Sequence, residues 1–201
     1  MMKKTHLTIG IASAIAVTNP ETVAESLVAI MGGVIGALIC DIDLLDNGYK
    51  NDNFFEKFIA VKITGIILFV DFLLKTGICE YILNRDKTFL MIGGILFGIL
   101  CLVGIKSAHR TFTHSFTGLL LFSIAFWFVY PPIVYSFMIG FLSHIVLDFL
   151  NKKKIRLFYP SEFGLCLGFC YADGIVNTIL MYIGTIASVL LMLNCLFFQY
   201  I

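Results

Sequence analysis

The sequence predicts an all-α, polytopic membrane protein, a helical bundle with about five to seven membrane-embedded helices. Its composition is the first reason: 59% of the residues are hydrophobic and only 13% are charged. Soluble domains carry about 45–50% apolar and about 25% charged residues, so lipid must cover part of this surface. The second reason is a succession of apolar runs separated by polar or proline-containing segments. The third is an uneven distribution of lysine and arginine between those segments.

The apolar runs cover residues 7–17, 23–40, 58–74, 89–105, 116–130, 133–150 and 175–198. The first is too short for a secure span, since a crossing helix needs roughly 20 residues, and a half-buried or re-entrant helix is the alternative. "TNPE" predicts a helix start, with Asn19 as the cap, Pro20 at the first helical position and Glu21 in the first turn. Glycines in the second run predict close packing against another helix. We expect residues 1–201 to form one domain.

If successive runs cross the membrane, segments 1–6, 41–57, 106–115 and 151–174 lie on one side. That side carries most of the basic residues, namely Lys3, Lys4, Lys50, Lys57, Lys106, Arg110, Lys152, Lys153, Lys154 and Arg156. The other side carries Lys75, Arg85 and Lys87. The positive-inside rule therefore predicts that the first side is cytoplasmic, in a cytoplasmic (inner) membrane.

The same side collects the residues that could carry chemistry. The chain has four histidines, and two of them fall in the short stretch "HRTFTHS". The full set is His6, Asp41, Asp43, His109, His114, His144 and Asp148, each at or near the end of an apolar run. Ionisable groups within membrane helices are costly and are usually functional. We therefore expect these side chains to form one site at one membrane face.

The spacing and the residue types favour a metal site. His144 and Asp148 are four residues apart, which places both side chains on one face of a helix. Imidazole together with carboxylate suits Zn²⁺ first, with Mn²⁺ or Fe²⁺ as alternatives, and the number of ligands allows one or two ions. Simpler interpretations exist: His6 as a polar terminal residue, Arg110 as an anchor at the headgroups, and "NKKKIR" as a topology signal.

The sequence also resembles the YdjM-like family, described as LexA-binding, inner-membrane-associated metal-dependent hydrolases. The resemblance rests on "THLTIG", "GALICDID", "AHRTFTHSF" and "GFLSHIVLDFLNKKKIRLFYP", which occur in family order between residues 5 and 160. Two departures stand out. Cys40 replaces the usual proline, and the nearest polar residue after Gly174 where relatives carry an acid is Asn177. The resemblance implies the site residues His6, Asp41, Asp43, His109, Arg110, His114, Ser115, His144 and Asp148.

Together these observations predict a membrane-bound, metal-dependent hydrolase of phosphoesters, such as a phospholipid or an isoprenyl phosphate. Arg110 would neutralise charge on the phosphate, Asp43 would serve as base, and Ser115 belongs to the predicted catalytic set. Membrane lipid is the expected partner, and no direct nucleic-acid binding is expected. The alternative is a non-enzymatic metal-binding membrane protein that senses or scaffolds a cytoplasmic protein partner. A metal transporter is less consistent, because transporter sites lie near the bilayer midplane.

Overall fold

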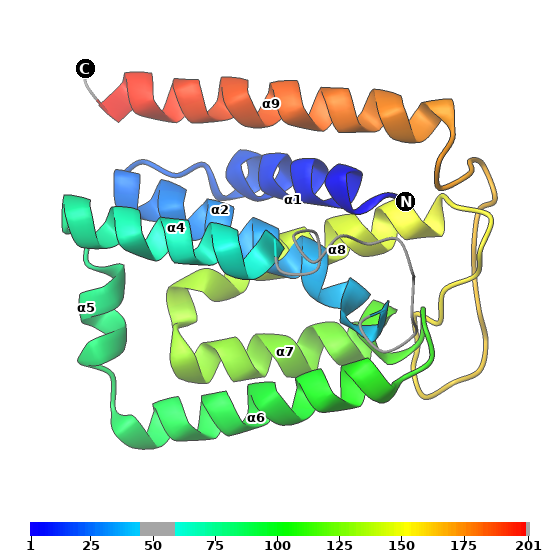
Figure 1. The fold of residues 1–201 in the computed structure, drawn as a ribbon, viewed down its shortest axis with the longest axis horizontal. Helices are drawn as coiled ribbons and strands as arrows, with labels where there is room; N and C mark the ends of the chain where they lie inside the picture. Colours follow the sequence, from blue (N-terminus) through cyan, green and yellow to red (C-terminus); the bar gives the residue numbers. More distant parts are fainter. Residues whose placement is uncertain (45–58, 200–201) are drawn as a thin grey trace.

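The computed structural model describes residues 1–44 and 59–199, and this part of the chain is helical, without a strand beyond isolated bridges (Figure 1). The α-helices are α1 (Lys3–Thr18), α2 (Val23–Ile39), α4 (Ile59–Leu74), α5 (Ile78–Leu83), α6 (Lys87–Lys106), α7 (Phe116–Val129), α8 (Val134–Phe149) and α9 (Ile175–Gln199). Short 3₁₀ helices are η1 (Cys40–Leu44), η2 (Phe112–His114) and η3 (Pro131–Ile133). The predicted all-α fold is confirmed.

Membrane-spanning length is reached by several of these segments. Within the described residues, four are long and apolar enough to cross a bilayer: Val23–Leu44, Lys87–Lys106, Pro131–Phe149 and Ile175–Cys195. Helix α7 is apolar but shorter. Large apolar side chains on α4, α6 and α9 are exposed, for example Phe69, Leu102 and Ile183. Such side chains are expected where lipid, and not water, surrounds a helix.

The connections between helices alternate between two ends of the bundle (Figure 1). One end holds the start of α1, η1, the turn of residues 107–115 and the long connection of residues 150–174. We call it the motif end, because all the predicted site residues lie there. The other end holds the α1–α2 turn, α5 and η3. The long helices thus bring polar segments from distant parts of the sequence to the same place.

Glycines bring α2 and α8 into backbone contact. A Cβ atom added at Gly36 would lie 2.2 Å from the Phe137 carbonyl oxygen, and one added at Gly140 would lie 2.6 Å from the Gly33 carbonyl oxygen. Only a residue without a side chain fits such contacts. The close packing predicted from the glycines of α2 is confirmed. It sets the end of α2, which leads into η1, directly beside the half of α8 that carries His144.

The turn between α1 and α2 differs from the prediction. Asn19 ends α1 in the left-handed conformation, with φ of 43°, and does not begin α2. The N-cap of α2 is Thr22, whose hydroxyl accepts the Glu25 N–H at 3.1 Å. The reason is that Pro20 disfavours a right-handed helical conformation for the residue before it, and asparagine tolerates the left-handed one.

A buried acid on α4 was not identified from the sequence. Asp71 is 2% exposed and lies near the end of α4, away from the motif end. Its carboxylate accepts the backbone N–H groups of Ile78 and Cys79 at 2.9 and 2.7 Å. These are the first groups of α5, which have no partner within their own helix. Asp71 therefore stabilises the α4–α5 turn.

Candidate metal centre

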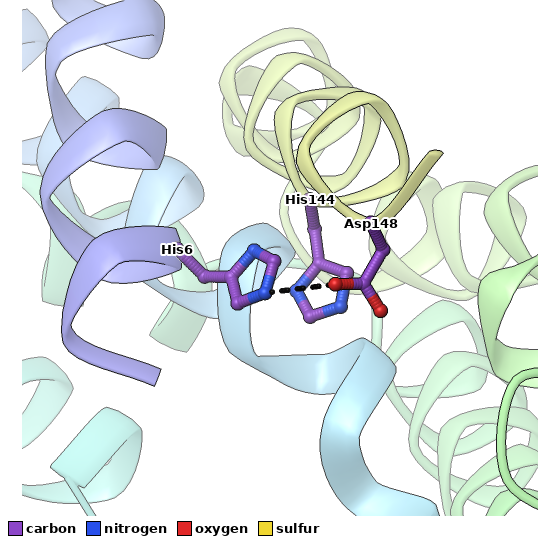
Figure 2. A group of neighbouring side chains, drawn as sticks. All are labelled: His6, His144 and Asp148. Atoms are coloured by element: carbon purple, nitrogen blue, oxygen red, sulfur yellow. Dashed lines mark ion pairs between the residues drawn. The ribbon is translucent and has the colours of Figure 1, made fainter. Parts of the chain in front are cut away.

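The predicted site residues come together at the motif end from four separate segments. His6 lies on the first turns of α1, and Asp41 and Asp43 lie on η1. His109 and His114 lie in the turn before α7, and His144 and Asp148 lie on α8. Figure 2 shows that His144 and Asp148 project from one face of α8 toward His6. The expectation drawn from their spacing of four residues is confirmed.

Two buried histidines face each other at the centre of the site. The Nε2 atoms of His114 and His144 are 3.2 Å apart, and both side chains are fully buried. His144 Nδ1 lies 2.7 Å from the Ala37 carbonyl oxygen, which only accepts, so this nitrogen carries the ring hydrogen. With the hydrogen on Nδ1, Nε2 is the lone-pair atom of the neutral tautomer of this ring.

The surroundings of His114 assign it the same tautomer. The Thr113 hydroxyl donates to Asp43 Oδ2 at 2.9 Å, which leaves its oxygen as an acceptor for His114 Nδ1–H at 3.1 Å. Burial lowers the pKa of His114 well below its ordinary value, so the ring is neutral. When both rings hold this tautomer, the two Nε2 lone pairs face each other. Two nitrogen ligands of one tetrahedral Zn²⁺, each about 2.0–2.1 Å from the ion, lie about 3.3 Å apart, and the observed separation fits this arrangement.

Carboxylate oxygens lie near the histidine nitrogens at distances similar to the separation of the two rings' Nε2 atoms. Asp41 Oδ1 lies 3.9 Å from the Nε2 atom of each of these two histidines. Asp148 Oδ2 lies 3.6 Å from His114 Nε2, and Asp148 Oδ1 lies 3.3 Å from His6 Nε2. The His6 ring stacks on the His144 ring, with centroids 3.7 Å apart (Figure 2).

Among the described residues, three overlapping groups place ligand atoms within 4.8 Å of one another. They are His6, His144 and Asp148; Asp41, His114 and His144; and Asp43, His109 and His114. Because His114 and His144 each belong to two groups, the donors form one continuous cluster. The chemistry of this donor set, imidazole and carboxylate in a buried setting, suits a divalent transition metal.

Asp43 differs from the other acids because donors already occupy both of its oxygens. His109 Nδ1 lies 2.9 Å from Oδ1. The Arg110 backbone N–H and the Thr113 hydroxyl donate to Oδ2 at 3.2 and 2.9 Å. The side chain is fully buried. Asp43 thus fixes the turn of residues 109–114 by accepting hydrogen bonds from the backbone and from the side chains of that turn.

Arg110 connects the site to the connection that follows α8. Its guanidinium pairs with Asp148 Oδ2 at 3.0 Å and donates to the Lys153 carbonyl oxygen at 2.9 Å. Its backbone is left-handed, with φ of 67°. A non-glycine residue in this region costs energy and persists only where its surroundings impose it, and such residues cluster at functional sites.

Ser115 has a different position from the one expected of a catalytic residue. Its hydroxyl donates to the Phe112 carbonyl oxygen at 2.7 Å and accepts the Gly118 N–H at 3.0 Å. It is the N-cap of α7 and is fully buried. Both hydrogen-bonding functions of this hydroxyl are used in the helix start that follows the histidine turn.

A cavity of about 330 Å³ opens at the motif end and leads to the site. Asp41, His109 and Asp148 line it, so candidate ligands are reachable from outside. Arg110 and three lysines also line it, namely Lys3, Lys4 and Lys153. The cavity therefore joins a cationic rim to a cluster of metal-binding side chains.

Several groups that build this site were not among the site residues predicted from the sequence. Thr113 and the Ala37 carbonyl group fix the two central rings. Asn177 on α9 is 2% exposed and accepts from the Thr5 hydroxyl at 2.8 Å. It stands where the resemblance places an acid in relatives, and it fastens α9 to the turn of α1 that carries His6. The neighbouring "T-H" in both "THLTIG" and "FTHS" was the one available signal for the two threonines.

The fold and the site define a polytopic helical membrane protein with a buried histidine–aspartate cluster at one end of its bundle. A family model described as "YdjM inner membrane protein" matches residues 1–201. The chain belongs to this family, and the resemblance identified from its motifs is confirmed over the whole chain. No curated protein and no solved structure is similar enough to this chain to count as a match.

Proposed function

We propose that this protein is a membrane-bound, metal-dependent hydrolase of phosphoesters. The observation that supports this most directly is the pair of buried histidines His114 and His144, whose Nε2 atoms lie 3.2 Å apart. Without a shared cation or proton, two lone pairs at this distance repel each other. A metal ion removes that repulsion and satisfies the carboxylates as well, because buried charges are normally paired or coordinate metals.

The ligand set would divide between one or two ions. His114, His144 and Asp41 would hold the first, and Asp148 with His6 would extend the cluster toward a second. Zn²⁺ fits this donor set best, and Mn²⁺ or Fe²⁺ are the alternatives. Such an ion, when bound, would lower the pKa of a coordinated water to about 7 and so would supply hydroxide at neutral pH.

Protein groups around the cavity would neutralise the charge of the phosphate and transfer protons. Arg110 neutralises negative charge that develops on phosphate oxygens. His109 is the partly exposed histidine of the set and lines the cavity, with its Nδ1 held by Asp43. We assign proton transfer to His109, in place of Asp43, because donors occupy both Asp43 oxygens. We likewise assign Ser115 to capping α7 and not to catalysis.

The substrate would be an anionic lipid phosphate taken from the membrane face. Lys3, Lys4, Arg110 and Lys153 line the cavity, and cations of this kind attract a phosphate group. The cavity opens at the ends of membrane-spanning helices, which is the level of lipid headgroups. The excess of lysine and arginine at the motif end supports a cytoplasmic orientation for this face.

Arg110 provides the test, because it is not a proposed ligand. We expect Arg110→Ala to keep bound metal and to lose about 10²–10³-fold in turnover. Arg110→Lys should recover only part of the loss, because lysine lacks the bidentate fork. The assay presents phosphatidic acid, lysophospholipids and isoprenyl phosphates in mixed micelles with Zn²⁺ or Mn²⁺. The matched control is Arg85→Ala at the opposite end, where the guanidinium contacts backbone carbonyls of α7. Equal loss in both variants would remove Arg110 from the mechanism.

One observation favours the non-enzymatic alternative, a metal-binding membrane protein that senses or scaffolds a protein partner. His6, His114 and His144 are at most 1% exposed, and structural metal sites are closed whereas catalytic ones keep an open position. Metal bound at the histidines with no turnover of any of these lipid phosphates, together with tight binding of a cytoplasmic protein, would favour this alternative over hydrolysis.

A further inference from the structure

The connection of residues 150–174, here called the α8–α9 loop, is held in place by hydrogen bonds although it has no regular secondary structure. Ile155 and Leu165 exchange backbone hydrogen bonds of 2.8 and 2.9 Å across the loop, and Ile155 is fully buried. The Phe116 N–H donates to the Leu157 carbonyl oxygen at 2.9 Å, which ties the loop to the start of α7. The loop therefore presents a defined surface across the motif end (Figure 1).

The surface of the α8–α9 loop is unusually apolar for a segment that connects two helices outside the membrane. Five large side chains in the loop are between 47% and 75% exposed: Phe158, Phe163, Leu167, Phe169 and Tyr171. Water alone would be an unfavourable environment for so many aromatic groups.

Positive charge accompanies the aromatic side chains. Lys152, Lys153 and Lys154 are exposed, and Arg156 follows them. Lys152 Nζ lies 3.8 Å from the centre of the Tyr171 ring, so basic and aromatic groups share one surface. The acids of the loop are Glu162 and Asp173, fewer than its basic residues.

The position of the loop relative to the bilayer follows from the helices that flank it. The spanning segment that includes α8 ends at Phe149, and the one in α9 begins at Ile175. Both ends of the loop therefore lie at the same membrane face. Aromatic side chains concentrate at this level in membrane proteins, and clustered lysines there are attracted to anionic lipids.

We propose that the α8–α9 loop is a binding surface for the anionic phospholipids of the leaflet that it faces. The exposed aromatic side chains enter the boundary between headgroups and acyl chains. The three consecutive lysines contact lipid phosphates. This surface does not depend on hydrolysis at the metal centre, and it would serve equally in a protein without enzymatic activity.

Fluorescence of a single tryptophan in the loop tests the proposal. The chain has one tryptophan, Trp127 on α7, so Trp127→Phe gives a silent background in which Phe169→Trp reports on the loop. The protein is placed in phosphatidylcholine nanodiscs that contain a small fraction of lipid brominated near the headgroup, either phosphatidylglycerol or phosphatidylcholine. We expect brominated phosphatidylglycerol to quench at least about fivefold more effectively, the equivalent of one lysine at a membrane surface.

Charge variants then test whether the three lysines cause the preference for phosphatidylglycerol. Replacing Lys152, Lys153 and Lys154 with glutamine should make the two brominated lipids quench equally. The matched control, Lys75→Gln with Lys87→Gln at the opposite end, should keep the preference. Equal quenching by both lipids before any lysine is removed would overturn the proposal. So would emission typical of water with no quenching, which would leave the loop free for a protein partner. If Phe169→Trp disturbs folding, Phe163→Trp provides a second reporter on the same surface.

Discussion

Replacing Asp43 with asparagine separates a residue that orients ligands from one that binds metal. In the structure Asp43 accepts hydrogen bonds from three groups: His109 Nδ1 at 2.9 Å, the Arg110 N–H at 3.2 Å and the Thr113 hydroxyl at 2.9 Å. Its Oδ2 also lies 3.6 Å from His114 Nδ1. Asparagine is nearly the same size but has one acceptor oxygen and one donor nitrogen. One side of the carboxylate site therefore loses its acceptor, and a donor faces a donor there.

The expected magnitude follows from this loss. An acceptor behind a metal-ligating histidine fixes its tautomer, and removing it typically costs about 10–100-fold in metal affinity. That range corresponds to about 1.4–2.7 kcal/mol. The buried donor left without a partner also lowers the free energy of unfolding by about 1–3 kcal/mol. We expect Asp43→Asn to bind the same number of ions as the unmodified protein, each more weakly.

Two measurements check this. Metal titration of the detergent-purified protein gives stoichiometry and affinity, with Asp41→Asn as the matched comparison. Asp41 lies 3.9 Å from both central Nε2 atoms, so this variant should lose an ion or most of the affinity. Histidine ¹⁵N spectra of metal-free protein should show His114 protonated at Nδ1, and Asp43→Asn should alter that signal.

The reasoning would be refuted by Asp43→Asn losing one full equivalent of metal while the remaining ion binds normally. That result would make Asp43 a ligand in the group with His109 and His114. Unchanged affinity together with an unchanged histidine spectrum would be equally damaging, because it would show that Asp43 does not control the rings.

Further outcomes follow from other parts of the molecule. His144→Ala should sharply reduce bound metal in elemental analysis, and His6→Ala should reduce it less, since His144 belongs to two of the three ligand groups. Gly36→Ala should destabilise the bundle by about 1–3 kcal/mol or more in a denaturation curve, because its Cβ would press on the α8 backbone. Asn177→Ala should lower the melting temperature, since Thr5 loses its buried acceptor, at a cost of about 1–3 kcal/mol. Single cysteines at 152–154 in a cysteine-free background should resist impermeant thiol reagents in intact cells, and ready labelling would reverse the proposed orientation.

The sequence could predict which residues meet, because long apolar helices carry polar ends to one of two faces. The spacing of His144 and Asp148 was enough to place them on one face of a helix, since the helical period is fixed by the backbone. The glycines of α2 likewise indicated close packing. These features depend on local geometry that residue identity largely determines.

The roles of the individual acids could not be predicted in this way. Asp41 and Asp43 stand two residues apart in "DID", and the 3₁₀ turn directs one toward the central histidines and the other under the turn of 109–114. That turn includes Arg110 in the left-handed region, a conformation that contacts from η1 and the α8–α9 loop impose. The start of helix α5 also depends on such a contact, because its first N–H groups are bonded to Asp71 on α4. The predicted segment 41–57 lies mostly outside the described residues.

The cluster joins the earliest part of the chain to a late one, and this fixes the order in which it can be assembled. His6 on α1 contacts Asp148 on α8, and Thr5 is bonded to Asn177 on α9. During synthesis, α1 must wait in the membrane until α8 has been inserted, and contacts so distant in sequence form slowly. A chain that ends before α8 therefore carries His6 without His144 and Asp148. The proposed metal centre would be complete only after α8 is inserted, and α9 would arrive last to hold α1 in position.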